Sequence, residues 1–246
     1  LMIFEITKWG IFLILVTVVS GGIFADIHNF IYEELSAAQY ALSFNIPKIP
    51  PEKFILYEVP FTSQAPLGDW KDPGQQSGCE EAAALMAMRW LSGEHLSPEN
   101  ALGEIISIAD FELKIYGEFR DTSVEDTVER IFKGYFKYDF IEVKKDIGTV
   151  DIKRELYRGN LVIVPVNGQK LGNPFFTPPG PIQHMVVAKG YDPRTKEFIT
   201  NDPGTKHGEN IRYKEEILEK ALQDYPTGYH KKISKVGKAM IVVSLR

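Results

Sequence analysis

The pattern of apolar and polar positions predicts helices first and strands later in the region after residue 53. Residues 79–91 are rich in strong helix formers, carry two carboxylates in the first turn and precede Gly93, a helix stop. Other helix starts are marked by N-caps, which supply side-chain acceptors to free backbone N–H groups. With caps at Ser97, Thr122 and Thr149, these further helices cover residues 98–109, 122–132 and 150–158, and a late helix covers 214–222.

Short apolar runs bounded by Gly, Pro, Asn or Asp predict strands in the second half. The predicted strands cover residues 138–143, 161–166, 184–190, 197–201 and 238–245. Helices followed by a run of antiparallel strands are typical of an α+β order and not of a βαβ alternation. We therefore expect an α+β fold in which N-terminal helices pack on an antiparallel sheet.

The chain begins with a hydrophobic segment. No charged residue occurs between Lys8 and Asp26, and the run WGIFLILVTVVSGGIFA fills that interval. This length is at the short end of what crosses a membrane, so residues 1–26 predict a signal peptide or a membrane anchor, with a buried core helix as the alternative. The expected location is therefore membrane-anchored or exported, with the domain outside the cytoplasm.

The rest of the chain divides at a proline-rich stretch. Residues 27–53 are predicted to form a juxtamembrane amphipathic helix and an extended linker, because three prolines occur in the nine residues of NIPKIPPEK. Residues 54–246 then form one domain of the size of many catalytic domains.

Composition and charge narrow the function classes. The 246 residues carry a formal charge of −5 and no basic cluster, so nucleic acid is not an expected partner. A single cysteine permits neither an intrachain disulfide nor a CxxC motif, and the five histidines are not spaced as metal ligands. P-loop, dinucleotide-binding and zincin motifs are absent from the sequence. We expect no metal and no cofactor, and the sequence does not determine the oligomeric state.

The lone cysteine, Cys79, lies at the start of a predicted helix. The helix dipole and free N–H groups at that end favour a thiolate, which predicts a lowered pKa and a nucleophile; a buried structural cysteine is the alternative. Gly78 is expected to leave room for a substrate backbone. Glu80 and Glu81 place negative charge nearby and could raise the thiol pKa, or they could cap free N–H groups or pair with a cation.

A histidine and an aspartate are predicted to meet across a hairpin. If the turn between strands 184–190 and 197–201 is centred near Pro193, His184 directly faces Asp202. Such a pair has Cβ atoms ~5 Å apart, within reach of a carboxylate–imidazole hydrogen bond. A strand-end histidine and an unrelated Asp-Pro turn are the alternative interpretation.

Four short stretches together carry a resemblance to a known family. VPFTSQ at 59–64, GCEEA at 78–82, QHMVV at 183–187 and NDP at 201–203 resemble the family related to the bacteriocin-processing, double-glycine-leader cysteine peptidases. That resemblance implies a papain-like fold over residues 54–246, although many relatives have Cys-Gly-Pro at the nucleophile.

The resemblance also implies roles for individual residues. It implies Cys79 as nucleophile, His184 as general base and acid, and Asp202 as the residue that orients His184. Gln64 matches the glutamine that would help form the oxyanion hole, while Gln75 and Gln76 stay open as alternative donors.

Residues near these positions are candidates for contact with substrate. Trp70, Gln76 and Gly78 lie close to the cysteine in sequence, and Phe175 lies in a proline-rich segment that precedes His184. We expect a cysteine peptidase that cleaves peptide or amide bonds of a peptide or protein through a Cys-His-Asp triad and a thioester. Alternatives are an acyltransferase or amidase on the same triad, or a noncatalytic extracytoplasmic binding module.

Overall fold

The computed structural model describes residues 54–235 and 237–245. The predicted membrane segment at 1–26 and the predicted helix and linker at 27–53 lie outside the described residues. Within the described part of the chain, no helix is both long enough and apolar enough to cross a membrane.

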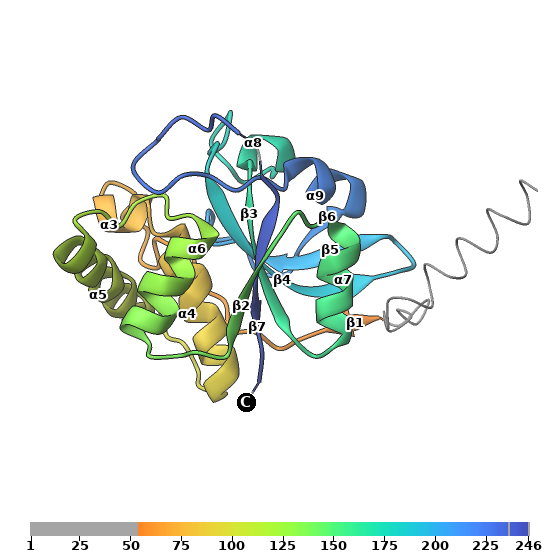
Figure 1. Ribbon diagram of the computed structural model, residues 1–246, viewed down its shortest axis with the longest axis horizontal. Coiled ribbons are helices and arrows are strands. Elements are labelled where there is room, and N and C mark those ends of the chain that lie inside the picture. The colour runs from red at the N-terminus through yellow and green to blue at the C-terminus, as the bar shows by residue number, and fades with distance from the viewer. Residues whose placement is uncertain (1–53, 236, 246) are drawn as a thin grey trace, which may run out of the picture. The chain divides into compact units, whose positions relative to one another are not determined.

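The described residues form an α+β fold, as predicted (Figure 1). The helices are α3 (Pro73–Gln76), α4 (Cys79–Ser92), α5 (Pro98–Tyr116), α6 (Val124–Asp126), the π-helix η2 (Thr127–Tyr135), α7 (Thr149–Tyr157), α8 (Gly168–Leu171) and α9 (Glu215–Ala221). The strands are β1 (Ile55–Leu56), β2 (Ile141–Lys145), β3 (Leu161–Val166), β4 (His184–Asp192), β5 (Glu197–Asn201), β6 (Ile211–Lys214) and β7 (Ala239–Val243).

The strands form one antiparallel sheet with the order β2-β7-β3-β4-β5-β6, and β1 pairs with β4. Helices cover both faces: α4, α5 and α6 lie on one side of the strands, and α7 and α9 on the other (Figure 1). In β3, Leu161 and Ile163 join one core cluster, while Val162 and Val164 join the other. Burial on both faces explains why this strand is an unbroken apolar run and not an alternating one.

The β4–β5 hairpin corrects the predicted register. Val187 pairs with Asn201, and the register shifts between Ala188 and Gly190, as in a β-bulge. Continuing the pairing beyond Val187 places His184 opposite residue 204, so the prediction that His184 directly faces Asp202 is wrong. The two residues are diagonal neighbours, a separation that long side chains still span.

Several predicted boundaries also shift. The helix that begins at Pro98 continues to Tyr116 and ends at Gly117, whose φ of 77° is left-handed. The predicted cap Thr122 is wrong, because Ser123 accepts the hydrogen bond from the Asp126 N–H at 3.3 Å.

Two further starts differ by a few residues. Gly148, not Thr149, precedes the first turn of α7, and its N–H donates to the Asp151 carboxylate at 2.9 Å. The first strand was predicted at residues 138–143. The observed strand, β2, covers Ile141–Lys145, because the pairing with β7 begins at Ile141.

Candidate active site

Cys79 is the first residue of α4, and the turn before it is tightly built. Asp72 caps α3 by accepting a hydrogen bond from the Gln75 N–H at 2.9 Å. Gly78 is the N-cap residue of α4, and a Cβ atom there would lie 2.7 Å from the Gly74 carbonyl oxygen. Gly78 thus makes room for the backbone of α3, and it does not line the pocket described below, so this placement does not support the expectation that it leaves room for substrate.

His184 begins β4 and forms a buried pair with Asp202, which follows β5. Their Nε2 and Oδ1 atoms are 2.7 Å apart, and the side chains are 2% and 0% exposed. Tyr213 and Asn173 donate to the other carboxylate oxygen at 2.7 and 3.0 Å, and the Gly204 N–H donates to Oδ1 at 3.0 Å. Burial opposes ionisation, but His184, Tyr213 and the Gly204 N–H hold the pKa of Asp202 below its usual value.

This arrangement leaves a defined role for the other imidazole nitrogen. Because Nε2 of His184 faces Asp202, Nδ1 is the ring nitrogen left for a reacting group. Sequence reasoning missed Asn173 and Tyr213, since neither lies near Asp202 in the chain and no motif marks them.

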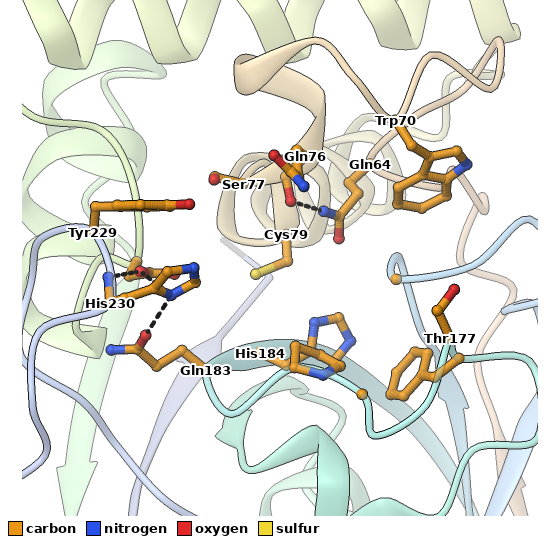
Figure 2. A pocket seen from close by; sticks show the side chains of 15 residues that line it. Gln64, Trp70, Gln76, Ser77, Cys79, Thr177, Gln183, His184, Tyr229 and His230 are labelled. Carbon is orange, nitrogen blue, oxygen red and sulfur yellow. Dashed lines mark hydrogen bonds and ion pairs between the residues drawn. The ribbon is translucent and has the colours of Figure 1, made fainter.

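Cys79 and His184 line one pocket of about 300 Å³. They enter it from opposite walls, the cysteine from the start of α4 and the histidine from the start of β4 (Figure 2). Gln64, Trp70 and Gln76 line the same pocket. Of the residues predicted to be catalytic or to contact substrate, four therefore line the same pocket as Cys79: Gln64, Trp70, Gln76 and His184.

The Cys79 thiol has a carboxylate as its neighbour. Its Sγ donates to Glu80 Oε2 at 3.0 Å, and the Tyr225 hydroxyl donates to Glu80 Oε1 at 2.6 Å. Burial first, and then the Glu80 charge, raise the pKa of the Cys79 thiol well above its usual value. The prediction of a thiol pKa lowered by the helix terminus is therefore wrong, and the open question of what Glu80 does is answered by its contact with sulfur.

Two more buried carboxyl groups belong to this region, one on α4 and one on α5. Glu81 and Glu112 are buried, and neither side chain has a hydrogen-bond partner among the described residues. Burial and then the charge of Glu80 raise the pKa of Glu112 to about 9, while burial and then Asp121 raise that of Glu80 to about 7. Burial and then Glu112 likewise raise the pKa of Glu81 well above its usual value. The start of α4 thus lies among buried carboxyl groups that ionise at higher pH than exposed glutamates do.

The three candidate glutamines occupy different positions. Gln64 lines the pocket, and its amide nitrogen donates to the backbone carbonyls of Gln75 at 3.0 Å and Gln76 at 2.6 Å. Gln75 is buried and does not line the pocket, whereas Gln76 does. Both amide hydrogens of Gln64 are therefore bound to the loop before Cys79 in this arrangement.

The aromatic residue at the pocket is the neighbour of the predicted one. Phe175 is 52% exposed, packs against His207 with ring centroids 4.9 Å apart, and does not line the pocket. Phe176 lines it and meets the His184 ring edge-on, with centroids 5.4 Å apart. The prediction of Phe175 as a substrate contact is not supported by this placement. Either phenylalanine fits the sequence pattern, so only the loop conformation distinguishes them.

A further wall of the pocket was missed by sequence reasoning. It includes Gln183, Tyr229 and His230 (Figure 2). Asp121 also lines the pocket. The His230 N–H donates to Asp121 Oδ2 at 2.6 Å, which joins a loop before α6 to a loop before β7. Only Gln183, which directly precedes His184, could have been noticed from the sequence.

Comparison with known proteins adds a family. The model of the Peptidase_C39-like family matches residues 56–232, more than half of the chain. No curated protein matches the sequence. A Bacillus anthracis protein described as a C39-like peptidase is 16% identical with a TM-score of 0.49, covering 78% of this chain and 98% of that one. Xylellain, a cysteine protease from Xylella fastidiosa, is 14% identical with a TM-score of 0.45, covering 82% of this chain and 91% of that one.

The family match spans the segments that carry Cys79, His184 and Asp202. It agrees with the resemblance noted in the sequence and with the α+β fold. The chain belongs to the Peptidase_C39-like family, and the protein is an enzyme, a cysteine peptidase.

Proposed function

We propose that this enzyme hydrolyses peptide bonds with Cys79 as nucleophile, His184 as general base and acid, and Asp202 as the positioning residue for the imidazole. The observation that carries the proposal is the buried 2.7 Å contact between Asp202 and His184, since His184 lines the same pocket as the one cysteine of the chain. A nucleophile, a base and a group that orients the base are the three parts that acyl transfer through a side chain requires.

The first half of the reaction forms a thioester. His184 Nδ1 takes the proton of the Cys79 thiol while the sulfur attacks the carbonyl carbon of the scissile bond. The C–N bond of the resulting tetrahedral intermediate then breaks, and the departing amine takes the proton from His184. The acyl group is left on Cys79 Sγ.

The second half restores the enzyme. A water molecule gives a proton to His184 as its oxygen attacks the thioester carbonyl. The C–S bond breaks, the acid product leaves, and the proton returns to the Cys79 sulfur. Throughout, the hydrogen bond from His184 to Asp202 fixes the ring orientation and stabilises the imidazolium.

The oxyanion would be held by the Cys79 backbone N–H and by Gln64. The first N–H groups of a helix have no partner within that helix, and Cys79 is the first residue of α4. Gln64 lines the pocket, and its amide becomes a donor to the oxyanion when it turns away from the Gln75 and Gln76 carbonyls. Substrate binding against the loop would favour that turn.

The charge next to sulfur affects the first step. Because Cys79 donates to Glu80, the resting nucleophile is a neutral thiol and not a preformed thiolate–imidazolium pair. Proton transfer to His184 therefore accompanies the attack on the carbonyl. The rate of the first step should therefore depend strongly on how the scissile carbonyl is placed against the Cys79 sulfur.

The decisive experiment traps the thioester. The full chain is incubated with a mixture of unstructured peptides, quenched in acid and weighed by intact-protein mass spectrometry. We expect an added acyl mass on the wild type that hydroxylamine removes. Cys79→Ala and His184→Ala should show neither the adduct nor cleaved peptides, with circular dichroism confirming that both variants are folded.

The same experiment separates the alternatives. Released acid indicates hydrolysis, whereas an amide formed with an added amine indicates acyl transfer on the same triad. Peptides bound but never cleaved, with no adduct and no effect of Cys79→Ala, would reject the proposal in favour of a noncatalytic binding module.

We also propose a membrane-anchored or exported location with the domain outside the cytoplasm. The support is the uncharged stretch between Lys8 and Asp26. Fractionation of cells that express the full chain, followed by protease treatment of intact cells, tests it. A protease-resistant protein in the soluble cytoplasmic fraction would contradict it.

A further inference from the structure

A second cavity of about 610 Å³ adjoins the pocket of Cys79 and His184. The two cavities share Gly180, Pro181, Gln183 and His230 as lining residues, so the same side chains form a wall of each. Gln183 directly precedes His184 in the chain. A peptide lying across the catalytic pocket would therefore reach the second cavity within a few residues of the scissile bond.

The wall between the cavities is held in place by hydrogen bonds. Gln183 donates through Nε2 to the Lys231 carbonyl at 3.2 Å, and its Oε1 lies 3.3 Å from His230 Nδ1. Gln183 is 7% exposed, which indicates a side chain fixed by its neighbours. The start of the 230–233 segment is thereby tied to the start of β4.

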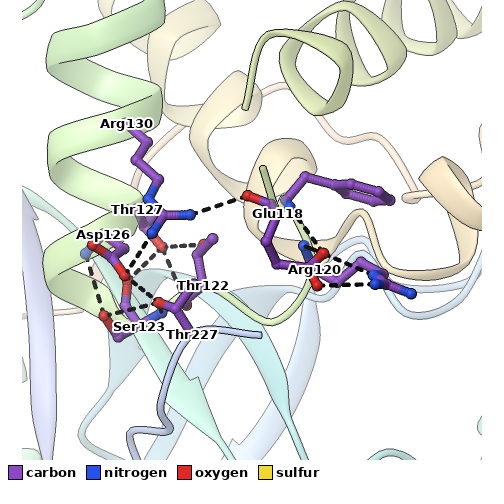
Figure 3. A network of polar contacts seen from close by, with 9 residues as sticks. Glu118, Arg120, Thr122, Ser123, Asp126, Thr127, Arg130 and Thr227 are labelled. Atoms are coloured by element: carbon purple, nitrogen blue, oxygen red, sulfur yellow. Dashed lines mark hydrogen bonds and ion pairs between the residues drawn. The ribbon is translucent and has the colours of Figure 1, made fainter. Parts of the chain in front are cut away.

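The loop that carries this segment is anchored at its other end as well. The Gly228 N–H donates to the carbonyls of Arg120 and Asp121, each at 3.2 Å, and the Arg120 guanidinium lies over the Tyr229 ring at 4.4 Å. Arg120 in turn pairs with Glu118 within the polar network of this region (Figure 3). The same network includes the Ser123 N–H, which donates to the Thr227 hydroxyl at 2.9 Å (Figure 3). The second cavity thus has a wall of defined position.

The chemistry of the second cavity differs from that of the catalytic pocket. Amide side chains and the apolar side chains of Pro181, Ile182 and Ile233 line it, together with Lys231 and Lys232, and no carboxylate is among its lining residues. Neither lysine forms an ion pair within the described part of the chain. The Lys231 side chain folds back over Gly228, so Lys232 is the cation with greater freedom to meet a ligand. By contrast, the first pocket is lined by Asp121, and Glu80 lies behind its cysteine.

From these observations we infer that the second cavity is a substrate subsite that takes a carboxylate a few residues from the scissile bond. This inference rests on the proposed function and adds a substrate class to it: peptides with an acidic group on one side of the cleaved bond. Lysine supplies the charge, and the Gln223 amide can supply hydrogen bonds to the carboxylate oxygens, as can the second amide hydrogen of Gln169, whose Nε2 also donates to the Gly180 carbonyl at 3.2 Å. The carboxylate could belong to an Asp or Glu side chain or to the peptide C-terminus.

The test measures binding, so that it does not depend on turnover. Full-chain Cys79→Ala is immobilised and offered an equimolar synthetic peptide library in which one position at a time is Glu, Gln or Lys, in free-acid and C-terminally amidated forms. We expect about threefold or greater enrichment of Glu over Gln at one position, and depletion of Lys. Loss of the preference on amidation alone would assign the carboxylate to the C-terminus.

Two charge reversals make the result specific. Lys232→Glu in the Cys79→Ala background should reverse the preference from Glu to Lys at the same position. Lys114→Glu changes charge equally on an exposed part of α5 that does not line either cavity, and it should leave the preference unchanged.

Absence of any Glu preference, or a preference that Lys232→Glu does not alter, would overturn the inference. Cleavage of the library by the wild type, measured in parallel, keeps the two proposals apart. Cleavage without an acidic preference contradicts the subsite alone, whereas selective binding without cleavage contradicts the proposed hydrolysis.

Discussion

The Cys79 sulfur lies 3.0 Å from Oε2 of Glu80, the residue that follows it in the chain. Glu80 is fully buried, and its second oxygen accepts a hydrogen bond from Tyr225. The thiol therefore donates to a carboxylate that a tyrosine from a distant loop holds in place. This contact favours the protonated nucleophile and opposes the helix dipole.

Replacing Glu80 by Gln should make the thiol more reactive toward alkylation. Without the negative charge beside sulfur, we expect the pKa of Cys79 to fall by about one unit and iodoacetamide alkylation at pH 7 to become about tenfold faster. Glu112→Gln is the matched control, because it removes a buried carboxyl group that makes no hydrogen bond to the thiol. An unchanged or slower rate in Glu80→Gln would show that Glu80 does not hold the proton on sulfur.

Stability should fall as the pH rises from 5 to 9. A carboxyl group whose pKa is raised in the folded state stabilises the fold below its unfolded pKa, and that contribution is lost as the pH rises toward the folded value. The folded-state pKa is about 7 for Glu80 and about 9 for Glu112, so the stabilising contribution of both residues is lost between pH 5 and pH 9. Carboxylates with lowered pKa, such as Asp202, act below this window, since their contribution is lost as the pH falls.

Glu112→Gln isolates one part of that dependence. The difference in free energy of unfolding between pH 5 and pH 9, measured in urea, should shrink by at least about 1 kcal/mol relative to the wild type. Glu142→Gln, an exposed residue of β2, is the control and should leave the difference unchanged. Equal pH dependence in wild type and Glu112→Gln would mean that Glu112 is ionised in the folded protein at pH 5.

Asp202→Asn should reduce kcat by about a hundredfold or more, because an amide stabilises neither the imidazolium nor the correct tautomer of His184.

Tyr213→Phe removes one donor to the Asp202 carboxylate, so the pKa of Asp202 should rise and the acidic limb of the kcat/KM profile should move to higher pH. A purely structural role for Asp202 predicts lower Tm with an unshifted pH profile in both variants.

Gly204→Ala should impair catalysis more than folding. A Cβ atom there would lie 2.9 Å from His184 Cε1 and 2.8 Å from Phe176 Cε1, so the imidazole has to shift. We expect kcat/KM to fall about tenfold or more. Gly103→Ala, in α5 with open space around its Cβ position, should retain full activity and gain about 0.5–1 kcal/mol of stability. Normal kcat/KM in Gly204→Ala would contradict the proposed constraint on the ring.

Local signals in the sequence were enough to place α4, β3 and β5. Strong helix formers before Gly93 predicted α4, and apolar runs between turn residues predicted the ends of β3 and β5. These elements depend on periodicity, caps and stops, which act over a few residues. The order of Cys79, His184 and Asp202 along the chain likewise needed no structure, and the family match agrees with it.

The contacts of those three residues depend on the tertiary structure. A shift in the β4–β5 register makes His184 and Asp202 diagonal neighbours, and Tyr213 and Asn173 reach Asp202 from other elements. The orientation of the Glu80 side chain depends on its hydrogen bond from Tyr225, which is 145 residues away in sequence. Local sequence determines which residues form helices and strands, but burial and distant partners determine where a polar side chain turns, because a buried polar group has to find its hydrogen bonds inside the fold.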